Sequence, residues 1–138
     1  MFLSALLRDP RQPWALVNAD TGTTLANRLE AALDSQSRRR GLLGRSSLDD
    51  EALVIAPCNG VHTCFMRFPI DIIIVNREGD ITLCSPDVPA WRIVMWYGFA
   101  TIELAAGTIH RTRTQRSQRL ALIPSAYTSH ASHPSGRL

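Results

Sequence analysis

The stretch that decides the fold is residues 70–84, IDIIIVNREGDITLC. Residues 70–75 form an almost unbroken apolar run, and a short run of this kind is typical of a strand covered on both faces of its sheet. Residues 76–80 read NREGD, which is the composition of a turn. We therefore predict that residues 81–84 return alongside residues 70–75 as the second strand of a hairpin.

Similar short runs flank this hairpin. Near the N-terminus, residues 14–18 read WALVN, and a turn signal at residues 20–22 followed by β-like residues predicts another hairpin. Pro69 interrupts or bulges the chain just before the central hairpin, and residues 85–89, SPDVP, are predicted to form a loop. Further strands are predicted at residues 52–56, 61–68, 100–105 and 120–123.

The region between these strands leaves two alternatives open. Leucine recurs every four residues from Leu25 to Leu33, which favours a helix, whereas the preceding turn favours a returning strand. Asp34 then offers an N-cap for a helix over residues 35–43 that ends near Gly44. The three consecutive arginines of this segment predict a solvent-exposed helix face.

The pattern as a whole predicts one mainly β domain, a jelly-roll-like β-sandwich or a barrel, with one short helix in the N-terminal third. A chain of 138 residues with 45% hydrophobic content has the size and composition of a single globular domain. We assign residues 1–13 to an N-terminal extension and residues 14–123 to the domain. Residues 124–138 are rich in Ser, His and Pro and are predicted to be a disordered tail.

The charge, the cysteines and the N-terminus predict which partners and which cellular location the chain has. The net charge is +3 and all fifteen basic residues are arginines spread along the chain, so there is no dense basic stripe for nucleic acid. Three cysteines without disulfide-like spacing predict reduced thiols. The N-terminus lacks the basic region of a signal peptide, and no run approaches the roughly 20 apolar residues of a membrane helix. We expect a cytoplasmic protein without a membrane span.

Charged residues inside apolar strands are the first candidate site. Asp71 and Glu103 lie among apolar residues, and a carboxylate in such a place needs a cationic or hydrogen-bonding partner. The candidate partners are Arg67, Arg92 and His62. These five residues predict either a polar ligand pocket or a structural ion-pair network, and the sequence leaves both open.

A second candidate is a weak metal site in residues 58–71, CNGVHTCFMRFPID. If residues 61–67 are extended, alternation places His62, Cys64 and Met66 on one face. With Cys58 nearby, these are ligands that a soft ion such as Cu(I) accepts. The alternative is that all of them are packing residues, and we predict no cofactor.

Several segments, taken together and in order, resemble the bacterial and archaeal family called domain of unknown function one hundred and ninety-two. The resemblance covers about residues 14–123. The matching segments are RRGLLGR at 39–45, CNGVHT at 58–63, MRFPID at 66–71, WR at 91–92, LAAGT at 104–108 and RLAL at 119–122.

The resemblance implies a compact jelly-roll-like sandwich in which residues 23–32 are strand, and it implies no established activity. The chain departs from the family pattern at Cys64-Phe65, which weakens a thiol role there, and at Ser117-Gln118, which implies a different final turn. Many relatives carry an export signal that is absent here. The polar motif residues of the family fall on Cys58, His62, Arg67, Asp71, Arg92 and Glu103.

Three functional hypotheses follow. The preferred one is a non-enzymatic binding or accessory module in which Arg67 or Arg92 grips a small anionic or sugar-like ligand or a protein partner. The second is a small hydrolase or metal-dependent enzyme that uses His62 with Cys58 or Asp71. The third is a partner-binding subunit of a secretion or cell-surface apparatus, with residues 91–99 as its exposed apolar patch. The alternative for residues 91–99 is that they cover one end of the sandwich.

Overall fold

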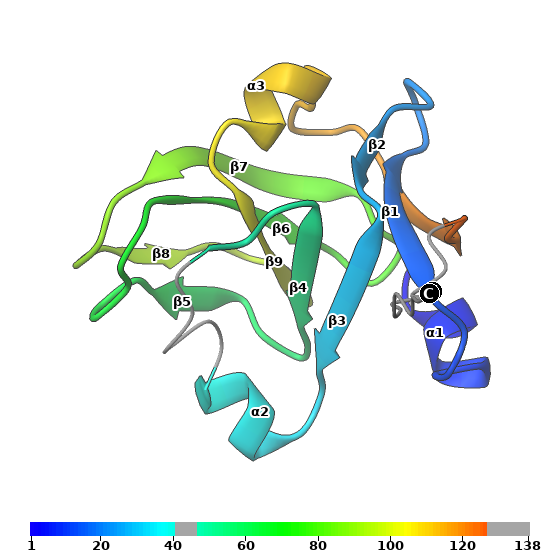
Figure 1. The fold of residues 1–138 in the computed structure, drawn as a ribbon, viewed down its shortest axis with the longest axis horizontal. Helices are drawn as coiled ribbons and strands as arrows, with labels where there is room; N and C mark the ends of the chain where they lie inside the picture. The colour runs from blue at the N-terminus through cyan, green and yellow to red at the C-terminus, as the bar shows by residue number, and fades with distance from the viewer. Residues whose placement is uncertain (41–46, 127–138) are drawn as a thin grey trace, which may run out of the picture.

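The computed structural model describes residues 1–40 and 47–126 (Figure 1). Its described strands form three sheets, with the orders β10-β1-β2, β3-β4-β9-β6-β7 and β5-β8. The elements are α1 (Ser4–Arg8), β1 (Trp14–Asn18), β2 (Thr24–Ala26), β3 (Arg28–Ala32), α2 (Ser35–Arg40), β4 (Glu51–Ile55), β5 (Gly60–His62), β6 (Ile70–Val75), β7 (Ile81–Val88), β8 (Ile93–Met95), β9 (Ala100–Ala105), α3 (Thr108–Thr112) and β10 (Leu120–Pro124).

The predicted hairpin forms, and its first strand, β6, lies inside the five-stranded sheet. Strand β6 pairs antiparallel with β7 on one side and with β9 on the other, and all six of its residues are buried. The prediction of a strand covered on both faces is confirmed. The predicted loop at residues 85–89 is wrong, since β7 continues to Val88. Pro86 is compatible with that strand because β7 is the edge of its sheet, where a missing N–H breaks no ladder.

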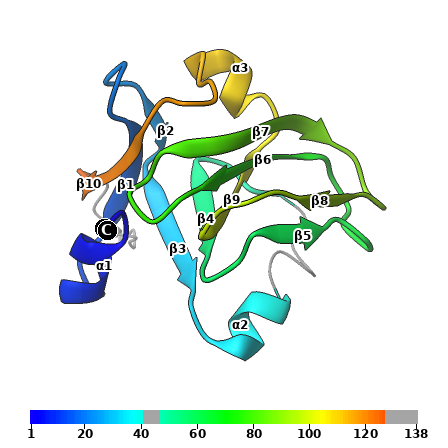
Figure 2. The ribbon, with the colours of Figure 1, turned by 180° about the vertical axis from the view of Figure 1, so that it is seen from behind.

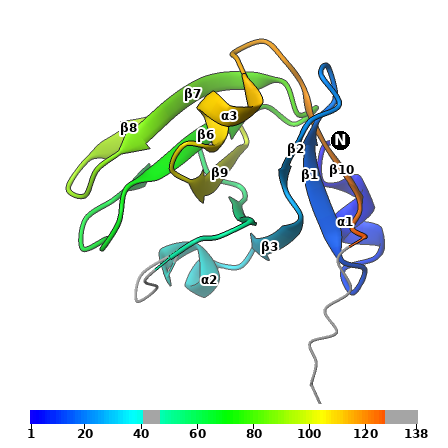
Figure 3. The same cartoon turned by 45° about the horizontal axis from the view of Figure 1, so that its top comes forward.

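Apolar side chains cover both faces of the five-stranded sheet. On one face, Val54, Ile73 and Ile102 pack with Leu16 and Leu120 of the three-stranded sheet. On the other face lie the apolar residues Leu53, Ile55, Ile70, Ile72 and Ile74, which pack with Val61 of β5 and Val94 of β8. The central sheet therefore lies between the three-stranded sheet and the β5-β8 pair, which occupy opposite ends of the molecule (Figures 2 and 3).

The sequence left residues 25–33 open between a helix and a strand, and the structure shows strands there, β2 and β3. Strands β1 and β2 form the predicted antiparallel hairpin, and β3 then pairs parallel with β4. Leu25 is buried and Leu33 is 36% exposed, so the four-residue spacing of the leucines does not mark one helical face. The mainly β class is confirmed, but the described sheets do not close into a barrel; the jelly-roll form stays a prediction.

The described residues contain three short helices where the sequence predicted one. Asp34 caps α2 as expected, because its Oδ1 accepts the Ser37 backbone N–H at 2.8 Å. This hydrogen bond and one from the Ser37 hydroxyl lower the pKa of Asp34. Helices α1 and α3 have five residues each, which is too short for a visible apolar period.

The N-terminal segment packs against the rest of the chain. Phe2, Leu3 and Leu6 are at most 7% exposed and belong to the same apolar cluster as Leu16. The last residues of the predicted helix at 35–43, and residues 127–138 of the predicted tail at 124–138, lie outside the described residues. Pro124, the first residue assigned to that tail, is the last residue of β10. Within the described part, no helix is both long enough and apolar enough to cross a membrane.

Candidate functional site

A two-stranded ribbon carries six of the ten large hydrophobic residues that are exposed in the described part of the chain. We define the ribbon as β5, β8, the loops at residues 63–69 and 89–92 that end it, and Trp96 and Tyr97 that follow β8. Gly60, Val61 and His62 pair antiparallel with Met95, Val94 and Ile93 respectively. Since side chains alternate along a strand, Val61 and Val94 face the central sheet while Ile93 and Met95 face outward.

Thr63 ties the two loops at the end of the ribbon together. Its side chain is 1% exposed. The hydroxyl donates to the carbonyl of Pro89 at 2.6 Å and accepts the N–H of Arg92 at 2.9 Å. The Thr63 backbone N–H also donates to the Arg92 carbonyl at 2.8 Å, and its carbonyl accepts the Trp91 N–H at 3.2 Å. One buried residue therefore fixes the position of both loops.

Two aromatic residues stand at this end of the ribbon on unusual backbone. Phe65 and Trp91 both have φ of 66°, a left-handed conformation that is uncommon for residues other than glycine. Their rings meet edge to face, with centroids 4.6 Å apart, and they are 70% and 60% exposed. Residues held in such a conformation cluster at ligand-contacting sites, so this geometry motivates a functional hypothesis.

The predicted extension of residues 61–67 is therefore wrong. Strand β5 ends at His62, and residues 63–66 form a turn closed by the Met66 N–H and the Thr63 carbonyl at 3.1 Å. Because the turn breaks the alternation, the argument that His62, Cys64 and Met66 share a face fails. Met66 instead packs with the apolar cluster beneath the ribbon.

The apolar surface continues along β8 to Tyr97. Ile93 and Met95 are 73% and 65% exposed, and Trp96 and Tyr97 are 43% and 58% exposed. Gly60 lies opposite Met95, and a Cβ at Gly60 would come within 2.7 Å of Met95 Cγ. The glycine therefore lets Met95 lie flat across the ribbon.

A shallow hollow opens on the same face. Its volume is about 250 Å³, and its walls are Asn59, Gly60, Val61, His62, Ile93 and Met95. Apolar side chains and one imidazole dominate this lining. The hollow suits an apolar group better than a sugar or a small anion, which need convergent polar partners.

Arg116 joins the ribbon from a distant segment. Its guanidinium lies 5.9 Å from the Trp96 ring centroid and donates to the Tyr97 hydroxyl at 3.0 Å. The hydrogen bond from Arg116 is the largest cause of the lowered pKa of Tyr97. Both side chains are exposed, so this cation belongs to the same outer surface as the aromatic rings.

Asp71 occupies a different place from the one that the pocket hypothesis needs. It is fully buried, and its carboxylate accepts backbone N–H groups from Asp87 at 2.9 Å, Gly107 at 3.2 Å and Ile109 at 2.7 Å. These donors fasten the end of β7 and the start of α3 to β6. The partners are thus backbone donors rather than the predicted arginines.

Burial, with a smaller contribution from the Asp71 charge, raises the pKa of Cys84 to about 11.

Glu103 lies on the opposite face of the sheet. It is 5% exposed and pairs in register with Leu53 and Ile72, while Asp71 pairs with Leu104. Neighbouring residues of a strand point to opposite faces, so the two carboxylates point away from each other. The five predicted pocket residues therefore do not converge on one hollow.

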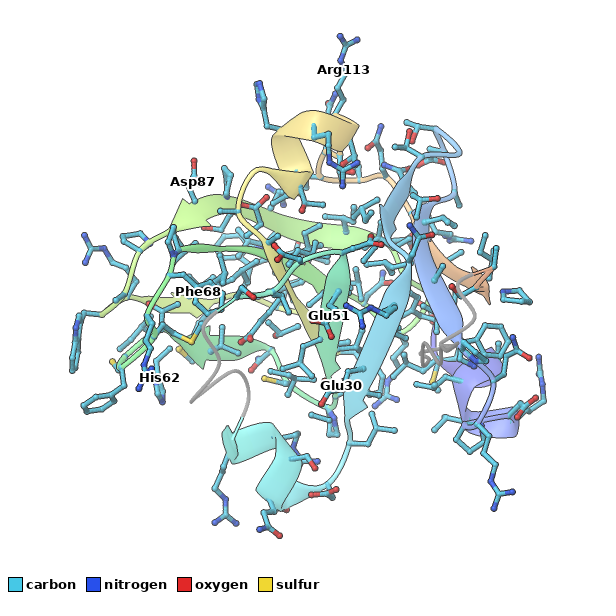
Figure 4. The ribbon with its side chains drawn as sticks, in the orientation of Figure 1. Glu30, Glu51, His62, Phe68, Asp87 and Arg113 are labelled. Atoms are coloured by element: carbon cyan, nitrogen blue, oxygen red, sulfur yellow. The ribbon has the colours of Figure 1, made fainter. Side chains whose placement is uncertain are left out.

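The remaining candidates lie on or near the ribbon. His62, Arg67 and Arg92 are exposed, and Figure 4 shows His62 at the ribbon, far from the central strands. Cys58 donates its thiol to the Gly60 carbonyl at 2.9 Å, and the His62 imidazole accepts the Cys64 N–H at 3.3 Å. No group of three or more His, Cys, Asp or Glu residues arranged to hold a metal occurs in the described part of the chain.

Sequence reasoning left residues 91–99 either as an exposed apolar patch or as a segment that covers one end of the sandwich, and it missed Thr63 and Phe65. Trp91, Met95, Trp96 and Tyr97 are exposed, whereas Val94 packs against the apolar cluster of the central sheet. A threonine in an alternating segment carries no signal of its own, because its role here depends on two loops that meet only in the folded chain. The dipeptide Cys64-Phe65, where the chain departs from the family pattern, was the available hint for Phe65.

Comparison with known proteins gives a family and a fold. No curated protein matches the chain. A crystal structure of a proposed transcription regulator from Sinorhizobium meliloti 1021 superposes with a TM-score of 0.68 at 21% identity, over 79% of this chain and 91% of that one. A protein of unknown function from Novosphingobium aromaticivorans DSM 12444 superposes with a TM-score of 0.65 at 19% identity, over 78% and 82% of the two chains.

These likenesses concern the fold, because the identities are too low to carry function. The family model covers more of the chain than any single motif does. The model of the DUF192 family, described as Uncharacterized ACR, matches residues 16–122. The chain belongs to the DUF192 family, whose members are uncharacterised.

Proposed function

We propose that this chain is a non-enzymatic binding module that contacts a large partner through the outer surface of its ribbon. The observation that carries the proposal is the exposure of six large apolar side chains on one continuous element. They are Phe65, Trp91, Ile93, Met95, Trp96 and Tyr97, each between 43% and 73% exposed. Contiguous apolar surface of this kind marks interaction sites in soluble proteins.

The arrangement of the ribbon supports contact rather than catalysis. Thr63 ties the two loops together, and the rings of Phe65 and Trp91 that the loops carry are in edge-to-face contact. A surface that is ordered before binding loses little conformational entropy when it binds. Aromatic residues and arginine are also the residue types that dominate binding energy at interfaces.

The small-ligand form of the proposal has less support. Arg67, Arg92 and His62 remain available as polar groups at the edge of the ribbon, whereas Asp71 and Glu103 are buried on opposite faces of the central sheet. The hydrolase alternative has the same weakness, since both Asp71 oxygens already accept backbone N–H groups. We therefore assign the polar residues a supporting role around an apolar contact.

The proposal can be tested by the state of the protein in native cell extract. The parent, the double variant Ile93→Asp/Met95→Asp and the control Leu7→Asp would be compared by gel filtration. Leu7 is 53% exposed on α1, at the opposite end of the molecule, and is a matched apolar control. We expect the parent and the control to elute in larger material and the double variant to elute as free protein.

Thermal unfolding of the purified proteins keeps this result interpretable, because all three should unfold at similar temperatures. Parent protein that elutes free in the extract and also fails to bind phospholipid vesicles would contradict the proposal. A Leu7→Asp variant that loses association as fully as the ribbon variant would contradict it as well.

A further inference from the structure

The end of the ribbon combines exposed aromatic rings with charged residues that are all basic. Residues 59–69 and 88–99 contain Arg67, Arg92 and His62 but no aspartate or glutamate. Arg92 follows Trp91 directly, and Arg67 lies two residues after Phe65. Arg116 adds a further cation beside Trp96.

The acidic residues next to these stretches do not cancel this charge at the ends of the loops. Asp71 belongs to the central strand β6 and is fully buried. Asp87 is exposed where β7 ends, and its side chain points outward along the upper edge of the sheet, away from the ribbon (Figure 4). The ends of the loops therefore present aromatic and cationic side chains, and the two stretches that form them, residues 59–69 and 88–99, contain no carboxylate.

We propose that the end of the ribbon inserts Phe65 and Trp91 into the interface of an anionic phospholipid bilayer, with Arg67 and Arg92 at the level of the headgroups. This inference rests on the function proposed above and names its partner. Trp and other aromatic rings favour the membrane–water interface because one part of the side chain is apolar and another is polar. Arginine beside them is attracted to anionic headgroups while its aliphatic stem stays in apolar surroundings.

The shape of the ribbon favours a bilayer over a folded partner. The two loops lie at the end of the molecule opposite α1 (Figures 1 and 3), and Phe65 and Trp91 at this end are 70% and 60% exposed. A projecting end enters a fluid interface without a complementary groove, whereas a protein partner would need one. The hollow beside Ile93 is shallow and lies along the ribbon, so it leaves the two rings at the end uncovered.

Two other occupants fit less well. A second copy of the chain, packed ribbon to ribbon, would bring Arg67 and Arg92 against their own equivalents without a carboxylate in either stretch to pair them. A peptide that adds as a further strand would gain few backbone hydrogen bonds, since β5 and β8 have three residues each.

The test is co-sedimentation of the full chain with vesicles of phosphatidylcholine alone or mixed with phosphatidylglycerol. Phe65→Asn/Trp91→Asn removes both rings, and asparagine suits the positive φ at these positions better than most residues. Burial of one aromatic ring contributes roughly the energy of a tenfold change in affinity. We expect the double variant to bind mixed vesicles about a hundredfold more weakly than the parent.

The charge reversal Arg67→Glu/Arg92→Glu separates the electrostatic contribution. Each arginine near an anionic surface contributes about a fivefold gain, so we expect at least about a twenty-fold loss on mixed vesicles. The same variant should change little on phosphatidylcholine alone, where the parent already binds weakly. Leu7→Asn and Arg113→Glu are the matched controls, because Leu7 is exposed on α1 and Arg113 is exposed at the end of α3, both away from the ribbon (Figure 1). Both variants should sediment nearly as the parent does.

Several results would overturn this inference. They are parent protein that stays in solution with mixed vesicles, binding that survives loss of both rings, and equal binding to the two vesicle types. Failure with vesicles together with ribbon-dependent association in cell extract would identify a protein partner, and then the membrane inference falls while the proposed binding function stands. Failure of both experiments removes the proposed function itself.

Discussion

Strand β6 is at most 1% exposed at every residue, whereas Ile93 and Met95 of β8 are 73% and 65% exposed. Both strands are short and apolar, and the difference between them is what covers them. The three-stranded sheet covers one face of β6 and the ribbon covers the other. The apolar residues of β6 are explained by folding alone, while those of β8 need a second explanation, for which we propose contact with a partner.

The polar residues repeat the same contrast. Asp71 is buried in β6 and uses its carboxylate to hold three backbone N–H groups from two other segments. Arg67 and Arg92 are exposed at the end of the ribbon. A buried charge with a full set of partners is a structural element, whereas an exposed cation beside exposed aromatic rings is available to another molecule.

The largest effect is expected at Asp71. Asp71→Ala removes the acceptor of three backbone N–H groups, of which that of Ile109 makes a buried hydrogen bond and those of Asp87 and Gly107 partly buried ones. The cost is about 1–3 kcal/mol for each group that water cannot reach. We expect a loss of about 4 kcal/mol in the free energy of unfolding, measured by urea denaturation. Asp87→Asn, an exposed change near one of the same donors, should stay within about 0.5 kcal/mol of the parent. A mild Asp71→Ala phenotype would mean that Asp71 does not anchor the fold.

The second prediction compares the two strands directly. Ile73→Ala in β6 removes a fully buried side chain and should cost about 3 kcal/mol in the free energy of unfolding. Ile93→Ala in β8 should change it by no more than about 0.5 kcal/mol, because the side chain is 73% exposed. The same denaturant titration measures both variants. Comparable losses at the two positions would show that the ribbon is part of the core and would remove the contrast.

The third prediction concerns the residue that joins the two loops. Thr63→Val keeps the shape of the side chain but removes the hydroxyl that binds Pro89 and Arg92. We expect a loss of about 2 kcal/mol in the free energy of unfolding and faster hydrogen exchange at the Arg92 amide. Thr63→Ser retains the hydroxyl and should retain the protection of that amide. Unchanged exchange in Thr63→Val would show that the loops are held by other contacts.

The smallest effect concerns the surface charge of the ribbon. The hydrogen bond from Arg116 is the main cause of the lowered pKa of Tyr97, so Arg116→Ala should raise that pKa toward its ordinary value of 10. The ultraviolet absorbance of tyrosinate, followed by titration, measures the shift, and Arg113→Ala is the control. If the pKa of Tyr97 were the same in Arg116→Ala and Arg113→Ala, Arg116 would not be the hydrogen-bond partner that lowers it.

Strands with a strong local pattern were predictable from the sequence. The apolar run of β6, the turn at residues 76–80 and the capping residue Asp34 all have local causes, namely burial on both faces, turn chemistry and an N-cap hydrogen bond. Strand β8 and helices α1 and α3 were missed. Each has five residues or fewer, so a period cannot be seen within it.

The candidate site was predictable only in its composition. The sequence indicated that Asp71 and Glu103 needed partners, and it left residues 91–99 either as an exposed apolar patch or as a cover over one end of the sandwich. Their placement depended on register. Asp71 lies opposite Leu104 and Glu103 lies opposite Ile72, and this one-residue offset points the two carboxylates to opposite faces.

The sequence by itself determined that this is a mainly β chain with a hairpin whose first strand, β6, is covered on both faces, because apolar runs and turn residues act over a few neighbours. Only the tertiary structure decided which apolar residues stay exposed and which polar ones are enclosed. Solvent exposure depends on segments far apart in the chain, such as Thr63 with Pro89 and Arg92, or Arg116 with Trp96 and Tyr97. Local pattern cannot carry that information, because the covering surface is built by residues dozens of positions away.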